Sequence, residues 1–265
     1  MIKSIEAKVM LAHVKQPDTW FGLKYNMNLY RGCQHQCIYC DSRSECYQIE
    51  NFSDILVKEN AIALLENELA RKRVKGTIGT GSMNDPYMPL EARIGLTRRA
   101  LEVIARFRFP VHVITKSDLV LRDLDLLRQI NAVYAAVSFT LTTTDDRLAK
   151  KLEPGAPAPS ARLRAMKILA ENGIHTGVTM MPILPFIEDN VENVTQIVTQ
   201  AHAHGAAYIL PGFGMTLRDR QRAYYYARLD RHFPGLRQQY ERRFGNAYFA
   251  PANDYAGLKA AFEAA

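Results

Sequence analysis

The stretch that decides the fold is Cys33-Gln-His-Gln-Cys37-Ile-Tyr-Cys40, which holds three of the four cysteines of this 265-residue chain. The fourth is Cys46, so that all four lie within fourteen residues. Disulfide frameworks spread their cysteines along the chain in order to join distant segments. Cysteines clustered in this way instead indicate a site for a metal ion or a metal cluster.

The spacing of these cysteines separates the kinds of metal site. Structural zinc sites usually take four ligands, often as two pairs with a longer insert between them, and His35 is an alternative fourth ligand here. Ferredoxin-type clusters also use four thiolates, usually with C-x2-C spacing. Three tightly spaced cysteines fit an iron–sulfur cluster with one iron left open. Because an open iron can bind a substrate or cofactor, the spacing favours catalysis.

Outward from this stretch, short apolar segments alternate with segments whose apolar residues recur every three or four positions. The first kind is typical of buried parallel strands, and six are predicted: Tyr25–Arg31, Gly76–Gly81, Val111–Thr115, Val133–Thr140, His175–Met181 and Ala206–Leu210. The second kind is typical of helices, and five are predicted: Ile55–Val74, Gly95–Phe107, Leu119–Ile130, Ala161–Asn172 and Val191–His204. The pattern predicts an α/β fold.

Alternating strands and helices imply parallel strands joined by right-handed crossovers. Six units form either an open doubly wound sheet or an incomplete barrel, since a closed barrel takes eight. In both, functional groups gather at the carboxyl ends of the strands. The segments richest in polar residues and glycine do follow predicted strands: Gly32–Tyr47, Ser82–Glu91, Lys116–Asp118, Thr142–Pro159, Pro182–Asn190 and Pro211–Thr216.

Composition bounds the organisation of the chain. With 48% hydrophobic and 23% charged residues, the chain can bury a large core. We expect an N-terminal arm over residues 1–24, a core over 25–216 and a basic helical C-terminal extension over 217–265. The first residues are too charged for a signal peptide, and no stretch is apolar enough to span a membrane. The sequence therefore predicts a cytoplasmic protein without a membrane partner.

The chain carries a net charge of +7, which favours anionic partners, nucleic acid foremost. The segment Leu217–Arg243 holds eight arginines and the run Tyr224-Tyr225-Tyr226. Arginines beside aromatic side chains suit phosphate contacts and base stacking. The alternative is a solvated helix face whose tyrosines pack on the core.

Cys33, Cys37 and Cys40, with Tyr39 among them and a predicted strand before them, resemble the radical S-adenosylmethionine superfamily. The resemblance implies a partial (β/α)6 barrel of the TIM-like type. It also implies that the three thiolates hold a 4Fe–4S cluster, whose open iron is chelated by S-adenosylmethionine. One electron, from a reductase or a flavodoxin- or ferredoxin-type donor, would cleave this cofactor to a 5′-deoxyadenosyl radical that abstracts a hydrogen atom.

Polar residues and glycines at the ends of later strands are candidates for the cofactor pocket. Glycines let the backbone approach a ligand closely, and in the superfamily the Gly79–Gly81 position contacts the cofactor's amino group. A lysine at a strand end can bind a carboxylate as a point charge, and an arginine can pair with one. The candidate set is Tyr39, Gly81, Ser82, Lys116, Ser138 and Arg162.

Further landmarks over residues 25–190 resemble a narrower group, the spore photoproduct lyase-like radical enzymes. They are Asn84-Asp85-Pro86, Ile114-Thr115-Lys116, Ser138 and Glu153-Pro154-Gly155 with Arg162. In that group the matching lysine and serine lie in the cofactor pocket. The chain departs from the lyase at two positions, because Ser82 stands where the lyase has a hydrogen-donating cysteine and Asp41 where it has a tyrosine. We therefore do not expect repair of spore photoproduct.

The sequence thus predicts a radical enzyme that abstracts a hydrogen atom from a substrate. Nucleic acid is the first candidate substrate, and a peptide or small metabolite is the second. The rival from another class is a non-catalytic module that binds an iron–sulfur cluster or zinc. Cys46 is either an inert thiol or a redox-active one, and no residue is assigned as catalytic.

Overall fold

The structure, a computed structural model, describes residues 1–16, 19–49 and 51–265. An eight-stranded sheet runs in the order β11-β10-β9-β8-β7-β6-β3-β2. Its six central strands are parallel to one another: β3 (Leu23–Met27), β6 (Thr77–Thr80), β7 (Val111–Thr115), β8 (Ala135–Thr140), β9 (His175–Ile183) and β10 (Tyr208–Thr216). The predicted α/β fold with a partial barrel of six units is confirmed.

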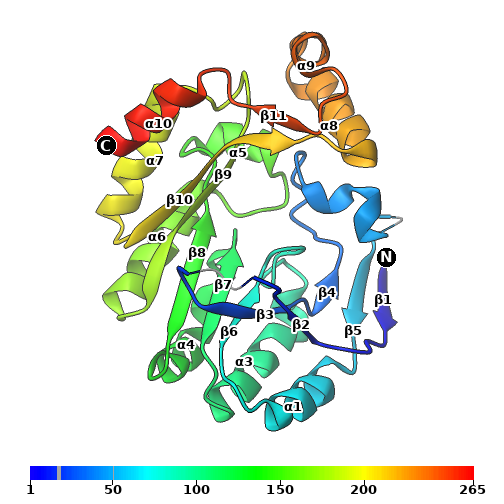
Figure 1. The fold of residues 1–265 in the computed structure, drawn as a ribbon, viewed down its shortest axis with the longest axis vertical. Helices are drawn as coiled ribbons and strands as arrows, with labels where there is room; N and C mark the ends of the chain where they lie inside the picture. Colours follow the sequence, from blue (N-terminus) through cyan, green and yellow to red (C-terminus); the bar gives the residue numbers. More distant parts are fainter. Residues whose placement is uncertain (17–18, 50) are drawn as a thin grey trace.

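Helices connect the parallel strands and cover the outer face of the sheet (Figure 1). The longer ones are α1 (Ala61–Arg71), α3 (Leu96–Arg106), α4 (Leu124–Asn131), α6 (Pro159–Glu171) and α7 (Val191–Ala203), with the short α2 (Glu91–Ile94) and α5 (Asp146–Leu152) between them. Every residue of β8 is buried, as expected for a strand covered on both faces. No helix among the described residues has the length and apolar character needed to cross a membrane.

Two predicted elements are wrong at their ends. The first predicted strand, Tyr25–Arg31, divides into β3 and β4 (Tyr30–Arg31), and β4 belongs to a separate small sheet in the order β1-β5-β4. The predicted helix Ile55–Val74 begins as a strand, β5 (Ile55–Lys58), whose residues alternate between buried and half-buried. Four residues are too few for hydrophobic periodicity to distinguish a strand from the first turn of a helix.

The segments outside the parallel strands also join the sheets. β1 (Ile2–Ile5) pairs with β5, and β2 (Leu11–His13) pairs antiparallel with β3. The C-terminal extension contains α8 (Asp219–His232), α9 (Leu236–Phe244) and α10 (Tyr255–Ala264). It also contains β11 (Phe249–Pro251), which pairs antiparallel with β10. The extension is therefore not purely helical, and the predicted loop Pro211–Thr216 is the end of β10.

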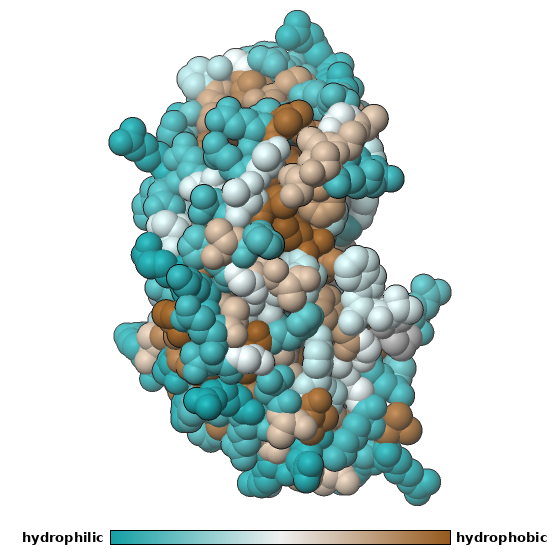
Figure 2. Space-filling view, turned by 90° about the vertical axis from the view of Figure 1, so that its left-hand side faces the viewer, coloured by the Kyte–Doolittle hydropathy of each residue, from teal (hydrophilic) through white to brown (hydrophobic). Residues whose placement is uncertain are grey.

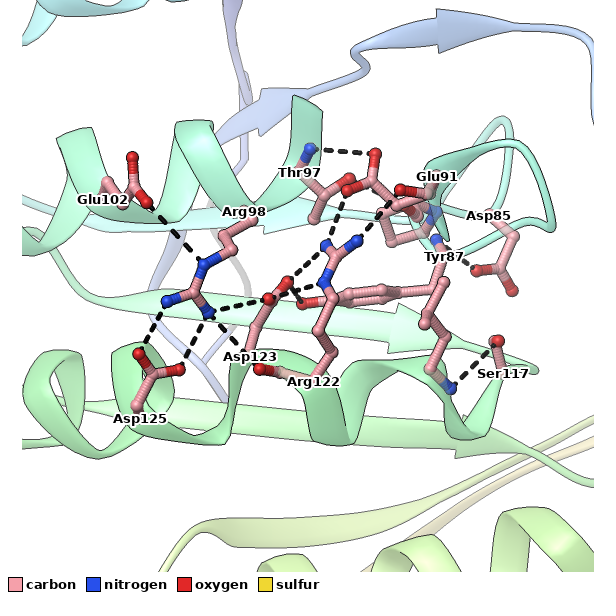
Figure 3. A network of polar contacts seen from close by, with 12 residues as sticks. Asp85, Tyr87, Glu91, Thr97, Arg98, Glu102, Ser117, Arg122, Asp123 and Asp125 are labelled. Atoms are coloured by element: carbon pink, nitrogen blue, oxygen red, sulfur yellow. Dashed lines mark hydrogen bonds and ion pairs between the residues drawn. The ribbon is translucent and has the colours of Figure 1, made fainter. Parts of the chain in front are cut away.

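A buried network of charges fastens the loop after β6 to the segment before α4 (Figure 3). Glu91 and Asp123 are fully buried, and the Arg122 guanidinium donates to their carboxylates at 2.7 and 2.8 Å. Arg98 donates to Asp123 at 3.1 Å, and the Tyr87 hydroxyl donates to its other oxygen at 3.0 Å. Because Tyr87 directly follows Asn84-Asp85-Pro86, the network fixes this loop at the carboxyl end of β6.

Replacing Arg122 by alanine should destabilise the protein. It leaves the buried Glu91 without its cation, and breaking a buried ion pair costs about 3–5 kcal/mol. Because Arg122 is 26% exposed and Arg98 remains, we expect a loss of about 3 kcal/mol in the free energy of unfolding, measured with denaturant. Arg128→Ala, an exposed site on α4, serves as the control. Equal losses in the two variants would contradict the role of Arg122.

Candidate active site

The predicted iron and cofactor residues meet at the carboxyl ends of β6, β7 and β8. A cavity of about 120 Å³ lies there between the cysteine loop, the residues after β6 and the end of β7. Six of the predicted residues line it: Cys33, Cys37, Cys40, Gly81, Ser82 and Lys116. The parallel strands thus bring together groups that lie up to 83 positions apart in the sequence (Cys33 and Lys116).

The cysteine loop is held from behind by the connection between α5 and α6. The Ile38 amide donates to the Leu152 carbonyl at 2.8 Å, and the Gly155 amide donates to the His35 carbonyl at 2.9 Å. A Cβ atom added at Gly155 would lie 2.1 Å from the carbonyl oxygen of Gln34. Glycine is required at 155 because the two backbones are in direct contact.

Glu153 is the centre of a buried polar cluster beneath the cysteine loop. Its carboxylate accepts hydrogen bonds from the Tyr39 hydroxyl and the Arg162 guanidinium, and Lys116 Nζ lies 3.9 Å away. Burial raises the pKa of Glu153, whereas the positive charges of Arg162 and Lys116 lower it by more. The net pKa therefore lies below the usual value, and the carboxylate is charged. Arg162 does not line the cavity and acts through Glu153.

Lys116 is the cation that reaches the cavity itself. Its side chain is 17% exposed and faces the cysteines as well as Glu153. Burial lowers the pKa of Lys116, whereas Cys37 and Glu153 raise it, and the net pKa lies above the usual value. The ammonium group therefore stays charged, as binding of a carboxylate requires.

Ser138 is not brought to the cavity. Its buried hydroxyl lies 2.7 Å from His112 Nε2 and 2.8 Å from the Tyr208 hydroxyl. Thr140, two residues later, lines the cavity instead. Residues two apart on a strand share a face but differ by about 7 Å in depth. The predicted strand Val133–Thr140 ends at the same residue as β8, so that Ser138 lies two residues before the strand end.

Asp85 and His35 also line the cavity. In the sequence, Asp85 was noted only as part of the motif Asn84-Asp85-Pro86, and His35 only as an alternative zinc ligand. The Asp85 carboxylate accepts hydrogen bonds from the Thr115 hydroxyl at 2.7 Å and the Lys116 amide at 2.6 Å. His35 is 1% exposed, and burial lowers its pKa. Within the described part of the chain, neither ring nitrogen of His35 makes a hydrogen bond, although Nδ1 lies 3.4 Å from an Asp85 carboxylate oxygen. Buried polar atoms of this kind beside a cavity fit a site built for a bound group.

The cysteine thiols fit a metal cluster. Burial raises the pKa of Cys33 to about 12 and raises those of Cys37 and Cys40 as well, and a bound metal would offset this by stabilising the thiolates. Among the described residues, no three ligand side chains are close enough to hold a single metal ion. Three thiols that line one cavity suit a cluster of several irons.

A second cavity of about 580 Å³ adjoins the first, and Cys40, Ser42, Ser82 and Lys116 line both. Its other walls are the ends of β9 and β10, together with residues of β11 and α10. Three large apolar side chains in these walls are partly exposed: Met181 at 41%, Phe249 at 46% and Tyr255 at 54%. Figure 2 shows apolar residues gathered on the upper half of one face, where Figure 1 places β10, β11 and α10. Exposed apolar surface beside a cavity is typical of ligand sites.

The tyrosine run on α8 is mostly packed inside the protein. Tyr225 and Tyr226 are buried in a hydrophobic cluster with Tyr240 and are not available for base stacking. Arg222 donates to the main-chain carbonyls of Leu217 and Ala247, at 2.9 and 2.7 Å. For these residues, the structure favours tyrosines packed on the core over a nucleic-acid contact.

Comparison with known proteins identifies the class. The model of the Radical SAM superfamily matches residues 27–198, which is more than half of the chain. The chain therefore belongs to the radical SAM superfamily and is a radical SAM enzyme whose reaction is unresolved. Membership implies use of a 4Fe–4S cluster and S-adenosylmethionine.

Particular relatives leave the substrate open. An uncharacterized protein of Methanocaldococcus jannaschii is 37% identical over 71% of this chain and 70% of its own length. An uncharacterized protein of Mycobacterium tuberculosis is 30% identical over 86% of this chain and 69% of its own length. A radical SAM Nalpha-GlyT isomerase of Pseudomonas phage M6 is 24% identical over 68% of this chain and 37% of its own length.

Among solved structures, a spore photoproduct lyase with bound AdoMet and dinucleoside spore photoproduct has a TM-score of 0.72. The match covers 99% of this chain and 78% of the lyase. At 14% sequence identity, this likeness shows a shared fold alone.

Replacing Gly155 by alanine should displace the cysteine loop, because the new methyl group would overlap the Gln34 carbonyl. We expect the anaerobically reconstituted variant to bind roughly half the wild-type iron or less. Gly173→Ala is the matched control, since it strains a positive φ of 76° but meets no atom within 4 Å. Equal iron contents in both variants would contradict a loop held by this contact.

Proposed function

We propose that Cys33, Cys37 and Cys40 hold a 4Fe–4S cluster and that S-adenosylmethionine binds in the cavity beside them. The observation that carries this proposal is the convergence of the three thiols with Gly81 and Lys116 on one cavity at the strand ends. When bound, the cluster and cofactor supply a 5′-deoxyadenosyl radical, which abstracts a hydrogen atom from a substrate.

Gly81 and Lys116 have distinct roles in this proposal. Gly81 has a φ of 101°, and a Cβ there would lie 2.0 Å from the Ile114 carbonyl oxygen, so that only glycine lets the backbone run along the cavity wall. This segment contacts the cofactor's amino group. Lys116 binds the cofactor's carboxylate as a fixed positive charge.

Tyr39 and Arg162 are positioning residues in this proposal, in place of the direct cofactor contacts that the sequence suggested. Both donate hydrogen bonds to Glu153, which in turn faces Lys116. Arg162 is 1% exposed and also donates to the Thr140 carbonyl at 2.9 Å. Together they fix the carboxylate that orients the lysine.

We further propose that the substrate is nucleic acid and that a single base enters the second cavity. The volume of about 580 Å³ lies in the range of small-ligand sites. Phe249 and Tyr255 offer partly exposed aromatic rings, on which a base can stack. The spore photoproduct lyase of similar fold binds a dinucleoside, which supports the same substrate class.

The reaction should differ from that of spore photoproduct lyase. Ser82 lines both cavities at the position where the lyase has its hydrogen-donating cysteine. Among the described residues that line the two cavities, the cysteines are the three proposed iron ligands, Cys33, Cys37 and Cys40. We therefore infer a reaction in which the substrate radical takes no hydrogen atom from a protein thiol.

The cluster assignment is tested with two cysteine variants. After anaerobic reconstitution, wild type and Cys46→Ala should bind about four irons per chain and release 5′-deoxyadenosine from S-adenosylmethionine when chemically reduced. Cys37→Ala should lose both properties, because it removes an iron ligand. Cys46 is the matched control, since its thiol is exposed and lies outside both cavities. Iron loss in Cys46→Ala equal to that in Cys37→Ala would overturn the assignment.

The substrate class is tested by oligonucleotide binding. Phe249→Ala and Tyr255→Ala should each weaken binding by about 5- to 150-fold, because stacking of a base on an aromatic ring contributes about 1–3 kcal/mol. Binding is measured by fluorescence anisotropy with labelled single-stranded oligonucleotides. Tyr248→Ala is the control, because Tyr248 is 58% exposed but does not line the cavity. If wild type binds no oligonucleotide at low salt, a peptide or small metabolite becomes the favoured substrate.

A further inference from the structure

The outer side of the cysteine loop, away from both cavities, packs against α5 and α8. The Ile38 amide bonds to the carbonyl of Leu152, the last residue of α5. On α8, Gln221 Nε2 donates to the Tyr39 carbonyl at 3.1 Å. The helices α5 and α8 therefore both contact the cysteine loop from its outer side.

Three of these outward side chains form a positively charged surface, which we call the α5–α8 basic surface: Lys151, Arg228 and Arg231. Lys151 Nζ lies 5.6 Å from the ring of Phe233, which directly follows α8, so that the ends of the two helices are neighbours. Lys151 and Arg231 are exposed, and Arg228 is half-buried. Among the described residues, these three side chains form no ion pair with a carboxylate, and the ion pairs of this region are made by other arginines.

Other arginines of the same region already form ion pairs with carboxylates. Arg218 pairs with Asp41 at 3.2 Å, and Arg237 pairs with Asp230 at 3.0 Å. The positive charge of the α5–α8 basic surface is thus not balanced locally, in contrast to its surroundings. An unbalanced charged surface of this kind attracts partners of opposite charge and increases their association rate.

A continuous series of contacts leads from this surface to the cysteines. The Arg228 guanidinium lies 4.9 Å from the Tyr224 ring, and the Arg43 guanidinium lies 3.6 Å from that ring. Arg43 donates to Gln36 Oε1 at 2.7 Å, and Gln36 Nε2 donates to the Cys33 carbonyl at 2.7 Å. None of the three basic-surface residues lines either cavity. A molecule bound there would be connected to the cysteine loop through these contacts and would leave both cavities uncovered.

We propose that the α5–α8 basic surface docks an acidic one-electron carrier protein that reduces the cluster. The proposal rests on the proposed function, because it requires a cluster at Cys33, Cys37 and Cys40. In the step, the carrier loses one electron and the cluster gains one, and no bond or proton is transferred. Charge complementarity favours a carrier with a negative surface around its redox group.

The test compares two charge-reversal variants of the reconstituted protein. One is Lys151→Glu, Arg228→Glu and Arg231→Glu together. The control is Arg71→Glu, Arg73→Glu and Arg99→Glu together, which changes the net charge equally. These three arginines are exposed and belong to the region of α1 and α3, at the opposite end of the molecule from α8 (Figure 1). Stopped-flow absorbance measures the rate of cluster reduction by a reduced, acidic flavodoxin.

We expect the first variant to be reduced by flavodoxin about tenfold more slowly, or slower still, at low ionic strength, with a weaker salt dependence. Reduction of the same variant by dithionite, which needs no docking surface, should change far less. The control variant should resemble wild type with both reductants. Equal slowing in both variants, or none in the first, would overturn the docking site.

Two further outcomes separate this proposal from its alternatives. If the first variant keeps its rate with flavodoxin but loses oligonucleotide binding, the α5–α8 basic surface binds nucleic acid, and the docking proposal is wrong. If wild type binds no iron, the proposed function fails before any docking is measured. A wild type that binds four irons and cleaves S-adenosylmethionine, with unchanged flavodoxin kinetics in the first variant, removes the docking proposal alone.

Discussion

The site depends on the contacts that the buried Glu153 carboxylate makes with Tyr39, Arg162 and Lys116. Burying a carboxylate beside Arg162 carries a large desolvation cost, which is offset only if every remaining polar group finds a partner. Here Arg162 also bonds to main-chain carbonyls, while Tyr39 and Lys116 satisfy the carboxylate. One charge thereby joins three elements: the cysteine loop, the end of β7 and α6. The cysteine loop, through Tyr39, and the cavity lysine hold their relative positions because both contact this carboxylate.

The depth of a residue along its strand decides which layer of the barrel it serves. Thr140 faces the cavity, whereas Ser138, on the same face of β8, lies about 7 Å deeper and bonds to His112 and Tyr208. Inward residues of such barrels stack in layers. His112, Ser138 and Tyr208 thus form a hydrogen-bonded layer beneath the site. Chemistry at the cysteines is therefore separated from the bottom of the barrel by a bonded layer.

The sequence predicted those parts of the site that depend on local pattern. Gly81 and Lys116 directly follow β6 and β7, and parallel strands bring such positions together. Ser138 does not line the cavity because it lies two residues before the end of β8, where it contacts His112 and Tyr208. Phe249 lies in the three-residue β11, which forms by pairing with β10 and has no local sequence signal, and Tyr255 begins α10 directly after that segment. Arg162 was found, but its action through Glu153 required the packing of the α5–α6 connection against the cysteine loop.

The cysteine loop has two sides with different electrostatics, and this difference follows from how each side is packed. On the inner side, Lys116 faces Glu153 and the thiols, so that its charge is balanced and its place is fixed. On the outer side, no ion pair among the described residues involves the α5–α8 basic surface. A small anionic group can reach Lys116 through the cavities, which Lys116 lines. A large acidic surface can instead contact the cations of the α5–α8 basic surface. The proposed electron carrier and the proposed substrate would therefore bind on different sides of the loop.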